Sequence, residues 1–100
     1  MEVKVNSVHF SADPKLVEFA NKKVKKLSTF FDGIIKADVT LKVAKPETAN
    51  NKVAELSLSI PATENLFAKK QADSFEEAID LAVDATKKQL DRYKQKLKSK

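Results

Sequence analysis

Apolar and polar residues alternate along four short stretches of the chain. The alternation covers residues 2–10, 36–45, 52–60 and 66–72, and the last of these stretches is the shortest and weakest. A period of two places every second side chain on the same side of a β-strand. Because the apolar side chains fall on one side of each stretch, we expect four strands whose sheet buries one face and leaves the other wet.

Two longer stretches have the apolar period of an amphipathic helix. Residues 14–31 form the first, and we expect one continuous helix there. Asp13 suits its N-cap, Pro14 suits its first position, and Gly33 lies where helices commonly stop. The second stretch begins at residue 74, a serine cap, and continues to about residue 97. Its predicted core stripe is Phe75, Ile79, Ala82, Val83, Thr86, Leu90, Tyr93 and Leu97.

The predicted order of elements is β-α-β-β-β-α. A crossover through the first helix should be right-handed and make the first two strands parallel. The later strands follow short connections and should pair in antiparallel fashion. We therefore predict an α+β fold with a four-stranded mixed sheet and two helices packed on one face. A chain of 100 residues is long enough for one domain, so we expect a single domain over residues 1–100.

Composition argues against catalysis. The chain has no cysteine, which excludes disulfides and thiolate metal sites and permits the cytoplasmic location that we expect. Its single glycine excludes glycine-rich phosphate loops, and its single histidine, His9, is accompanied by no nucleophile elbow. We expect no enzyme activity, no cofactor, no metal and no small-molecule substrate. Residues 1–5 alternate and lack the long apolar run that is typical of a signal peptide, and no apolar run is long enough to cross a membrane, so we expect no membrane partner.

Charge is distributed unevenly along the chain, whose net charge is +5. Residues 73–84 contain five acids and no bases, whereas residues 86–100 contain seven bases and one acid. A second basic cluster is Lys22, Lys23, Lys25 and Lys26. Such lysines either keep a surface soluble or bind an anionic partner. Each cluster alone leaves both interpretations open, and the arrangement of the two clusters on one surface decides between them.

A helical wheel separates the basic residues of the second helix into two rows. The row that we expect to face solvent without nearby acids is Lys88, Arg92 and Lys96. The row that shares its edge with acids is Lys87, Lys94 and Lys98. On the first helix, the row that borders the apolar stripe is Lys15, Lys22 and Lys26. Two helices side by side would expose one basic platform, which suits phosphates spaced along a nucleic-acid backbone.

Lysine supplies eighteen of the nineteen basic side chains and acts as a point charge. This composition favours recognition of backbone and shape, which is typical of structured RNA, over reading of base edges. Phe67 should lie on the open sheet face, where it is available to stack a base or is simply exposed. Two further functions stay open: a generic structured-RNA-binding module, and a regulator that binds an acidic protein, through the open sheet face for example.

Three segments resemble the ribosome hibernation-promoting factor and ribosome-associated inhibitor family, also known as sigma-54 modulation proteins. They are LSTFFDGI at residues 27–34, VTLKV at residues 39–43, and residues 78–98. The resemblance covers nearly the whole chain in the same order. It implies a β-α-β-β-β-α fold related to double-stranded-RNA-binding domains, which agrees with the order of elements predicted from the hydrophobic pattern.

The resemblance also implies a function. Members of the family bind the small ribosomal subunit between head and body, over the sites of messenger and transfer RNA, block translation and preserve idle ribosomes in stationary phase or stress. Family contacts come from basic residues of both helices, and one position departs from the pattern, because many members carry lysine where this chain has Ala85. Because the chain ends at Lys100, we expect a short form, for which ribosome dimerisation would need another factor. The residues expected to contact ribosomal RNA are Lys22, Lys23, Lys26, Lys88, Arg92, Lys94 and Lys96.

Overall fold

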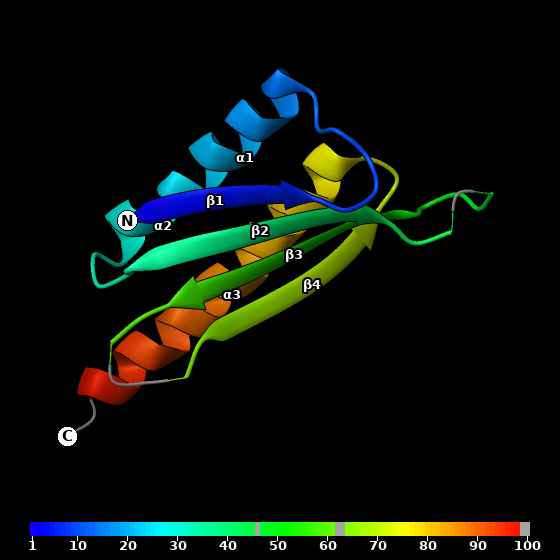
Figure 1. Cartoon of the computed structure of the whole chain (residues 1–100). Helices are drawn as coiled ribbons and strands as arrows, with labels where there is room; N and C mark the ends of the chain where they lie inside the picture. The colour runs from blue at the N-terminus through cyan, green and yellow to red at the C-terminus, as the bar shows by residue number, and fades with distance from the viewer. Residues whose placement is uncertain (46, 62–63, 99–100) are drawn as a thin grey trace.

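The computed structural model describes residues 1–45, 47–61 and 64–98. Four strands form one sheet, and the helices cover one of its faces (Figure 1). The elements in chain order are β1 (Glu2–Ser7), α1 (Pro14–Lys25), α2 (Leu27–Phe30), β2 (Lys36–Val43), β3 (Lys52–Ser59), β4 (Leu66–Ala72) and α3 (Phe75–Lys98). This arrangement confirms the predicted α+β fold and its β-α-β-β-β-α order, except that the first predicted helix is divided into α1 and α2.

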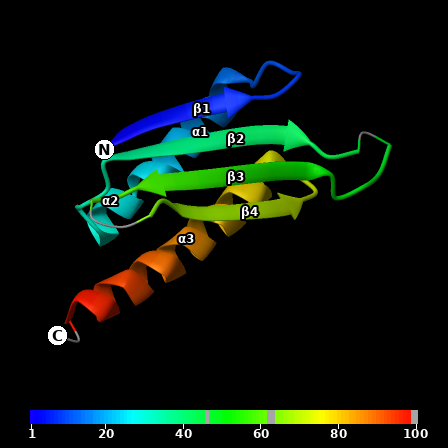
Figure 2. The same ribbon diagram turned by 60° about the horizontal axis from the view of Figure 1, so that its bottom comes forward.

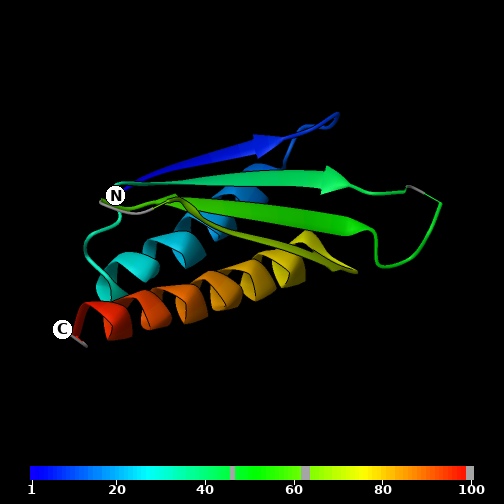
Figure 3. The same ribbon diagram turned by 90° about the horizontal axis from the view of Figure 1, so that it is seen from below.

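The strands lie side by side in the order β1-β2-β3-β4 (Figure 2). β1 is parallel to β2, and the two other pairs are antiparallel, as predicted. The crossover from β1 to β2 contains α1, which contacts β1, whereas α3 contacts β3 and β4. Seen along the sheet, the molecule therefore has two layers, with strands on one side and α1 and α3 next to each other on the other (Figure 3).

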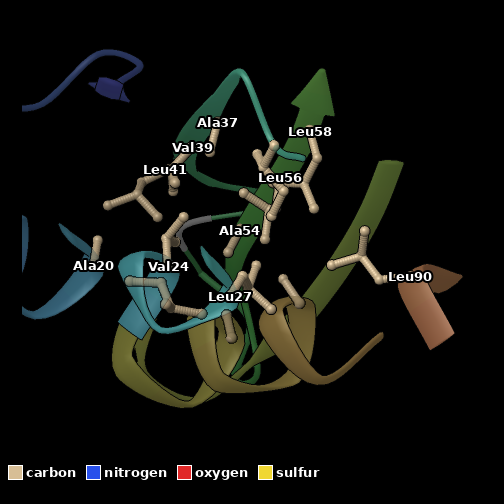
Figure 4. Close-up of a cluster of buried hydrophobic side chains, with 14 of the residues drawn as sticks. Ala20, Val24, Leu27, Ala37, Val39, Leu41, Ala54, Leu56, Leu58 and Leu90 are labelled. Atoms are coloured by element: carbon tan, nitrogen blue, oxygen red, sulfur yellow. The ribbon is translucent and has the colours of Figure 1, made fainter. Parts of the chain in front are cut away.

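The hydrophobic core fills the space between the two layers (Figure 4). Alternate residues of the central strands point into it, including Val39 and Leu41 from β2 and Leu56 and Leu58 from β3. Each of these side chains is almost fully buried, which stabilises the fold by roughly 1.5–3 kcal/mol per side chain. The helices contribute Leu16, Ala20, Val24, Leu27, Ala78, Ile79, Ala82 and Leu90.

The prediction of one continuous helix over residues 14–31 is wrong at Lys26, where α1 ends and α2 begins. The hydroxyl of Ser28 donates to the carbonyl of Lys25 at 2.7 Å, and the hydroxyl of Thr29 donates to that of Lys26 at 2.7 Å. Such side chains compete with backbone N–H groups for the carbonyls of the preceding turn, which bends or ends a helix.

Gly33 lies just beyond α2, but it is not in the left-handed conformation that favours glycine at helix ends. A β-carbon on Gly33 would lie 2.7 Å from Cε2 of Phe31. The Phe31 ring packs edge-to-face on Tyr93 of α3, with centroids 5.8 Å apart. Glycine is therefore required here because it leaves room for this ring pair, which fastens the end of α2 to α3.

Three predicted strands extend too far. β1 ends at Ser7 and not at residue 10, because the Ser7 hydroxyl donates to the Phe10 carbonyl at 2.6 Å and His9 takes a left-handed φ of 64°. β2 ends at residue 43 and β3 at residue 59. The predicted helix caps are confirmed: Asp13 accepts from the Lys15 N–H, and the Ser74 hydroxyl accepts from the Glu77 N–H.

Candidate nucleic-acid interface

A groove of about 520 Å³ follows the seam between α1 and α3 on the outer surface of the helix layer. Lys23 and Lys26 line it from the first helical segment, and Lys87 lines it from α3. Lys22 is exposed one turn before Lys26. The structure therefore brings the two basic clusters of the sequence together on one surface, as the wheel predicted.

A second groove of about 430 Å³ continues along α3. Lys87, Lys88 and Arg92 line it, together with two acids, Asp84 and Asp91. Lys88 and Arg92 are exposed and lie one helical turn apart, and Lys96 is exposed one turn further. A line of exposed cations thus extends along the outer surface of α3.

The expectation that the row of Lys88, Arg92 and Lys96 lies without nearby acids is wrong. Nζ of Lys88 lies 3.4 Å from Oδ2 of Asp84, four residues earlier on the same helix. Residues four apart lie next to each other on one side of a helix, so the wheel already placed Asp84 beside this row. Both side chains are largely exposed, so this ion pair contributes at most about 0.5 kcal/mol and leaves Lys88 able to bind a phosphate.

Lys23 has a different environment from the other candidates. Its Nζ lies 3.2 Å from Oδ1 of Asp80 on α3 and 5.6 Å from the centroid of the Phe19 ring. The ion pair with Asp80 connects α1 to α3 across the groove, whereas Phe19 lies one turn before Lys23 on α1 itself. Lys23 therefore helps to hold the two helices together, and its charge is partly compensated by Asp80.

Lys94, a residue of α3, is half-buried next to the C-terminal end of α2. Its Nζ lies 4.4 Å from the centroid of the Phe30 ring and donates to the Phe30 carbonyl at 3.2 Å. Lys87, two turns earlier on α3, lies 5.3 Å from the same centroid. Lys87 belongs to the row that the sequence placed beside acids, and it was left out of the candidate set. Its spacing of seven residues from Lys94 was the signal that both lie on one side of the helix.

Lys70 is a second cation that the sequence analysis missed. It pairs with Ala54 across β3 and β4, and so it lies on the face of the sheet that the helices cover. There it lines a hollow of about 350 Å³ with Ala85, Lys88 and Arg92. The alternation along β4 already placed Lys70 on the same side as Ala68 and Ala72, but it did not show that this edge lies beside the basic row of α3.

The open face of the sheet holds its lysines next to acids. Nζ of Lys42 and Nζ of Lys69 lie 2.7 and 3.9 Å from the same oxygen of Glu55, and Nζ of Lys36 lies 4.0 Å from Oδ2 of Asp38. Phe67 is 52% exposed on this face, as predicted. The sheet face therefore presents mixed charge beside an exposed ring.

Comparison with known proteins identifies the family. Residues 3–98 match the family model described as Sigma 54 modulation protein / S30EA ribosomal protein. The chain belongs to this family. A ribosome hibernation promoting factor from Klebsiella oxytoca is 29% identical over 98 residues, which cover 98% of each chain.

Two solved structures share the fold. A ribosomal subunit interface protein from Coxiella burnetii superposes with a TM-score of 0.84 at 20% identity, over 95% of this chain and 99% of that one. The N-terminal domain of Protein Y from Thermus thermophilus gives a TM-score of 0.77 at 23% identity, over 93% and 99% of the two chains. The family resemblance drawn from the sequence is thus confirmed, whereas the assignment of RNA contacts to individual residues stays a prediction.

Metal-binding clusters and membrane-spanning helices are absent from residues 1–45, 47–61 and 64–98. Histidine, aspartate and glutamate form no group of three or more there that could hold a metal ion. No helix within those ranges is both long and apolar enough to cross a membrane.

Proposed function

We propose that this protein binds the small ribosomal subunit and holds ribosomes in an inactive state. Membership of the family over residues 3–98 is the observation that carries this proposal. The relative from Klebsiella oxytoca, named as a ribosome hibernation promoting factor, supports it over nearly the full length. The protein would act in the cytoplasm as a single-domain binding protein, without a catalytic step, in stationary phase or stress.

The outer surface of the helix layer is the proposed contact with ribosomal RNA. Cations of both helices line its grooves together with Asp80, Asp84 and Asp91. Lysine point charges suit the phosphates of a backbone better than base edges. Bound between head and body of the subunit, the protein would cover the sites of messenger and transfer RNA. The contact residues of this proposal are Lys22, Lys23, Lys26, Lys88, Arg92, Lys94 and Lys96.

The test compares charge reversal on the two faces of the molecule. The helix-face variant carries Lys26→Glu, Lys88→Glu and Arg92→Glu, and the sheet-face variant carries Lys4→Glu, Lys36→Glu and Lys69→Glu. Both exchange three exposed cations for three carboxylates. We measure sedimentation with purified small subunits and inhibition of translation in a reconstituted system, each at several salt concentrations.

We expect the wild type and the sheet-face variant to bind and inhibit, and the helix-face variant to lose affinity by about a hundredfold or more. Loss of three phosphate contacts should reduce the slope of log K against log salt by about two to three units. Unchanged binding of the helix-face variant would contradict the assigned surface. Equal affinity of the wild type for any RNA duplex would favour a generic RNA-binding module, and nuclease-resistant association with a protein would favour a protein-binding regulator.

A further inference from the structure

Phe30 lies where three hollows of the helix layer meet. It lines the groove between α1 and α3, the groove along α3, and a third hollow of about 540 Å³ that Lys94 and Leu97 border. Its ring is half-buried, as the last residue of α2. Phe30 therefore lies at the centre of the proposed RNA-binding surface, although it carries no charge.

Two ammonium groups of α3 lie against this ring. Nζ of Lys94 is 4.4 Å and Nζ of Lys87 is 5.3 Å from its centroid, both within the range of a cation–π interaction. Lys94 also donates to the Phe30 carbonyl at 3.2 Å. Seven residues separate the two lysines, which corresponds to about 10 Å along the helix axis. One aromatic residue thus holds two cations that are spaced along the direction of the groove.

The position of Phe30 follows from the break in the first helix. The hydroxyls of Ser28 and Thr29 cap the carbonyls of Lys25 and Lys26, and the chain turns into α2. The next residue, Phe31, is extended and packs on Tyr93. Contacts at both ends of α2 hold this helix in place, and they thereby fix the side chain of Phe30 beside α3.

A lysine that is already held loses less conformational freedom when it binds a phosphate. Free lysine side chains have many rotamers, and ordering them opposes binding. The cation–π contact restricts the side chain and leaves the charge in place, whereas a carboxylate partner would compensate it. Of the three N–H donors of the Lys94 ammonium, one reaches the Phe30 carbonyl, and the others can donate to a phosphate oxygen.

We infer that Phe30 is a positioning residue that holds Lys87 and Lys94 as a pair of cations for two phosphates of an RNA backbone. The inference rests on the proposed function and adds Lys87 to its contact surface. Phe30 acts through the two lysines and makes no contact of its own with RNA.

Three single substitutions test the role of the ring. Phe30→Leu keeps an apolar side chain but removes the aromatic face, Phe30→Tyr keeps that face, and Phe67→Leu makes the same exchange on the opposite side of the molecule. Affinity is measured for purified small subunits and, separately, for a fully paired RNA hairpin. NMR reports the ε-methylene protons of Lys87 and Lys94, which a nearby ring shifts upfield, and amide spectra confirm that each variant is folded.

We expect Phe30→Leu to weaken binding of small subunits by about threefold to tenfold, and Phe30→Tyr and Phe67→Leu to stay within about twofold of the wild type. The upfield shifts should disappear only in Phe30→Leu. In a background with Lys87→Gln and Lys94→Gln, Phe30→Leu should have no further effect on affinity, because the ring then has no cations to position.

Other outcomes overturn the inference. A positioning role for the ring is excluded if Phe30→Leu binds small subunits with wild-type affinity. It is also excluded if Phe30→Tyr loses as much affinity as Phe30→Leu. An undiminished effect of Phe30→Leu without the two lysines would mean that the ring contacts RNA itself. If the wild type binds the hairpin but not small subunits, the proposed function fails, and the same variants decide the inference on the hairpin. Binding to neither RNA would overturn both.

Discussion

The helix layer and the open sheet face both carry several lysines, but they surround them differently. On the sheet, one carboxylate, Glu55, lies beside both Lys42 and Lys69. In the helix layer, Lys87 and Lys94 lie against the ring of Phe30, which attracts an ammonium group without cancelling its charge. The two faces therefore differ in how far neighbouring side chains compensate the charge of their lysines, and not in whether lysines are present.

Ion pairs also occur in the helix layer, but their carboxylates are more exposed to solvent than Glu55 is. Asp80 and Asp84, the partners of Lys23 and Lys88, are 51% and 62% exposed, whereas Glu55 is only 22% exposed. Exposed pairs contribute little because water and salt screen them. A phosphate can therefore replace the acids of the helix layer more easily than it can replace Glu55, whose position is set by strand register.

The two faces also differ in what they contribute to stability, and adjacent residues of β3 test this directly. Leu56 points toward the helices and is 1% exposed, whereas Ser57 points to the open face. We expect Leu56→Ala to lower the free energy of unfolding by about 2–5 kcal/mol and Ser57→Ala by less than about 0.5 kcal/mol. Urea denaturation measures both. Similar losses in the two variants would mean that the open face is also packed in solution.

A smaller effect is expected at Gly33, where the chain leaves the helix layer for the sheet. A methyl group there collides with the Phe31 ring, so Gly33→Ala should lower the free energy of unfolding by about 1–3 kcal/mol through displacement of Phe31 from Tyr93. Thermal or urea denaturation measures the loss. In a Phe31→Ala background the same substitution should cost almost nothing, since the colliding ring is absent. An equal loss in both backgrounds would point to backbone strain at residue 33.

Hydrophobic periodicity was enough to predict the strands and the two amphipathic helices, because one face of each element is buried. The crossover and the short connections then predicted how the strands pair. It failed at Lys26, since Leu27 continues the apolar stripe and conceals the break that the hydroxyls of Ser28 and Thr29 introduce. The sequence also assigned Gly33 to the end of a helix. In the structure, this glycine leaves room for the Phe31 ring, which packs on Tyr93, sixty positions after Gly33. Contacts between distant segments leave no periodic signal.

The sequence predicted where the candidate surface lies, but it did not predict every residue on that surface. The wheel brought the lysines of both helices to one surface, because each helix buries a single stripe. It could not show Phe30 beside Lys87 and Lys94, since these contacts join residues of different helices. Lys70 was missed for a similar reason, because it reaches the basic row of α3 from the edge of the sheet. Only tertiary structure brings these groups together.

The smallest expected effect tests whether acid neighbours alone distinguish the two faces. Glu55→Gln removes the carboxylate beside Lys42 and Lys69, and Glu47→Gln removes an exposed loop carboxylate with the same change in net charge. Both are made in the helix-face variant, in which the contribution of the helix layer to binding of an RNA hairpin is reduced. We expect Glu55→Gln to raise this affinity about twofold to threefold more than Glu47→Gln, because it leaves two cations uncompensated on one face. The affinities are measured by fluorescence anisotropy. Equal affinities in the two variants would show that uncompensated lysines alone do not make the sheet face bind RNA. The positioning of lysines by an aromatic ring would then be the feature that separates the helix layer from the sheet.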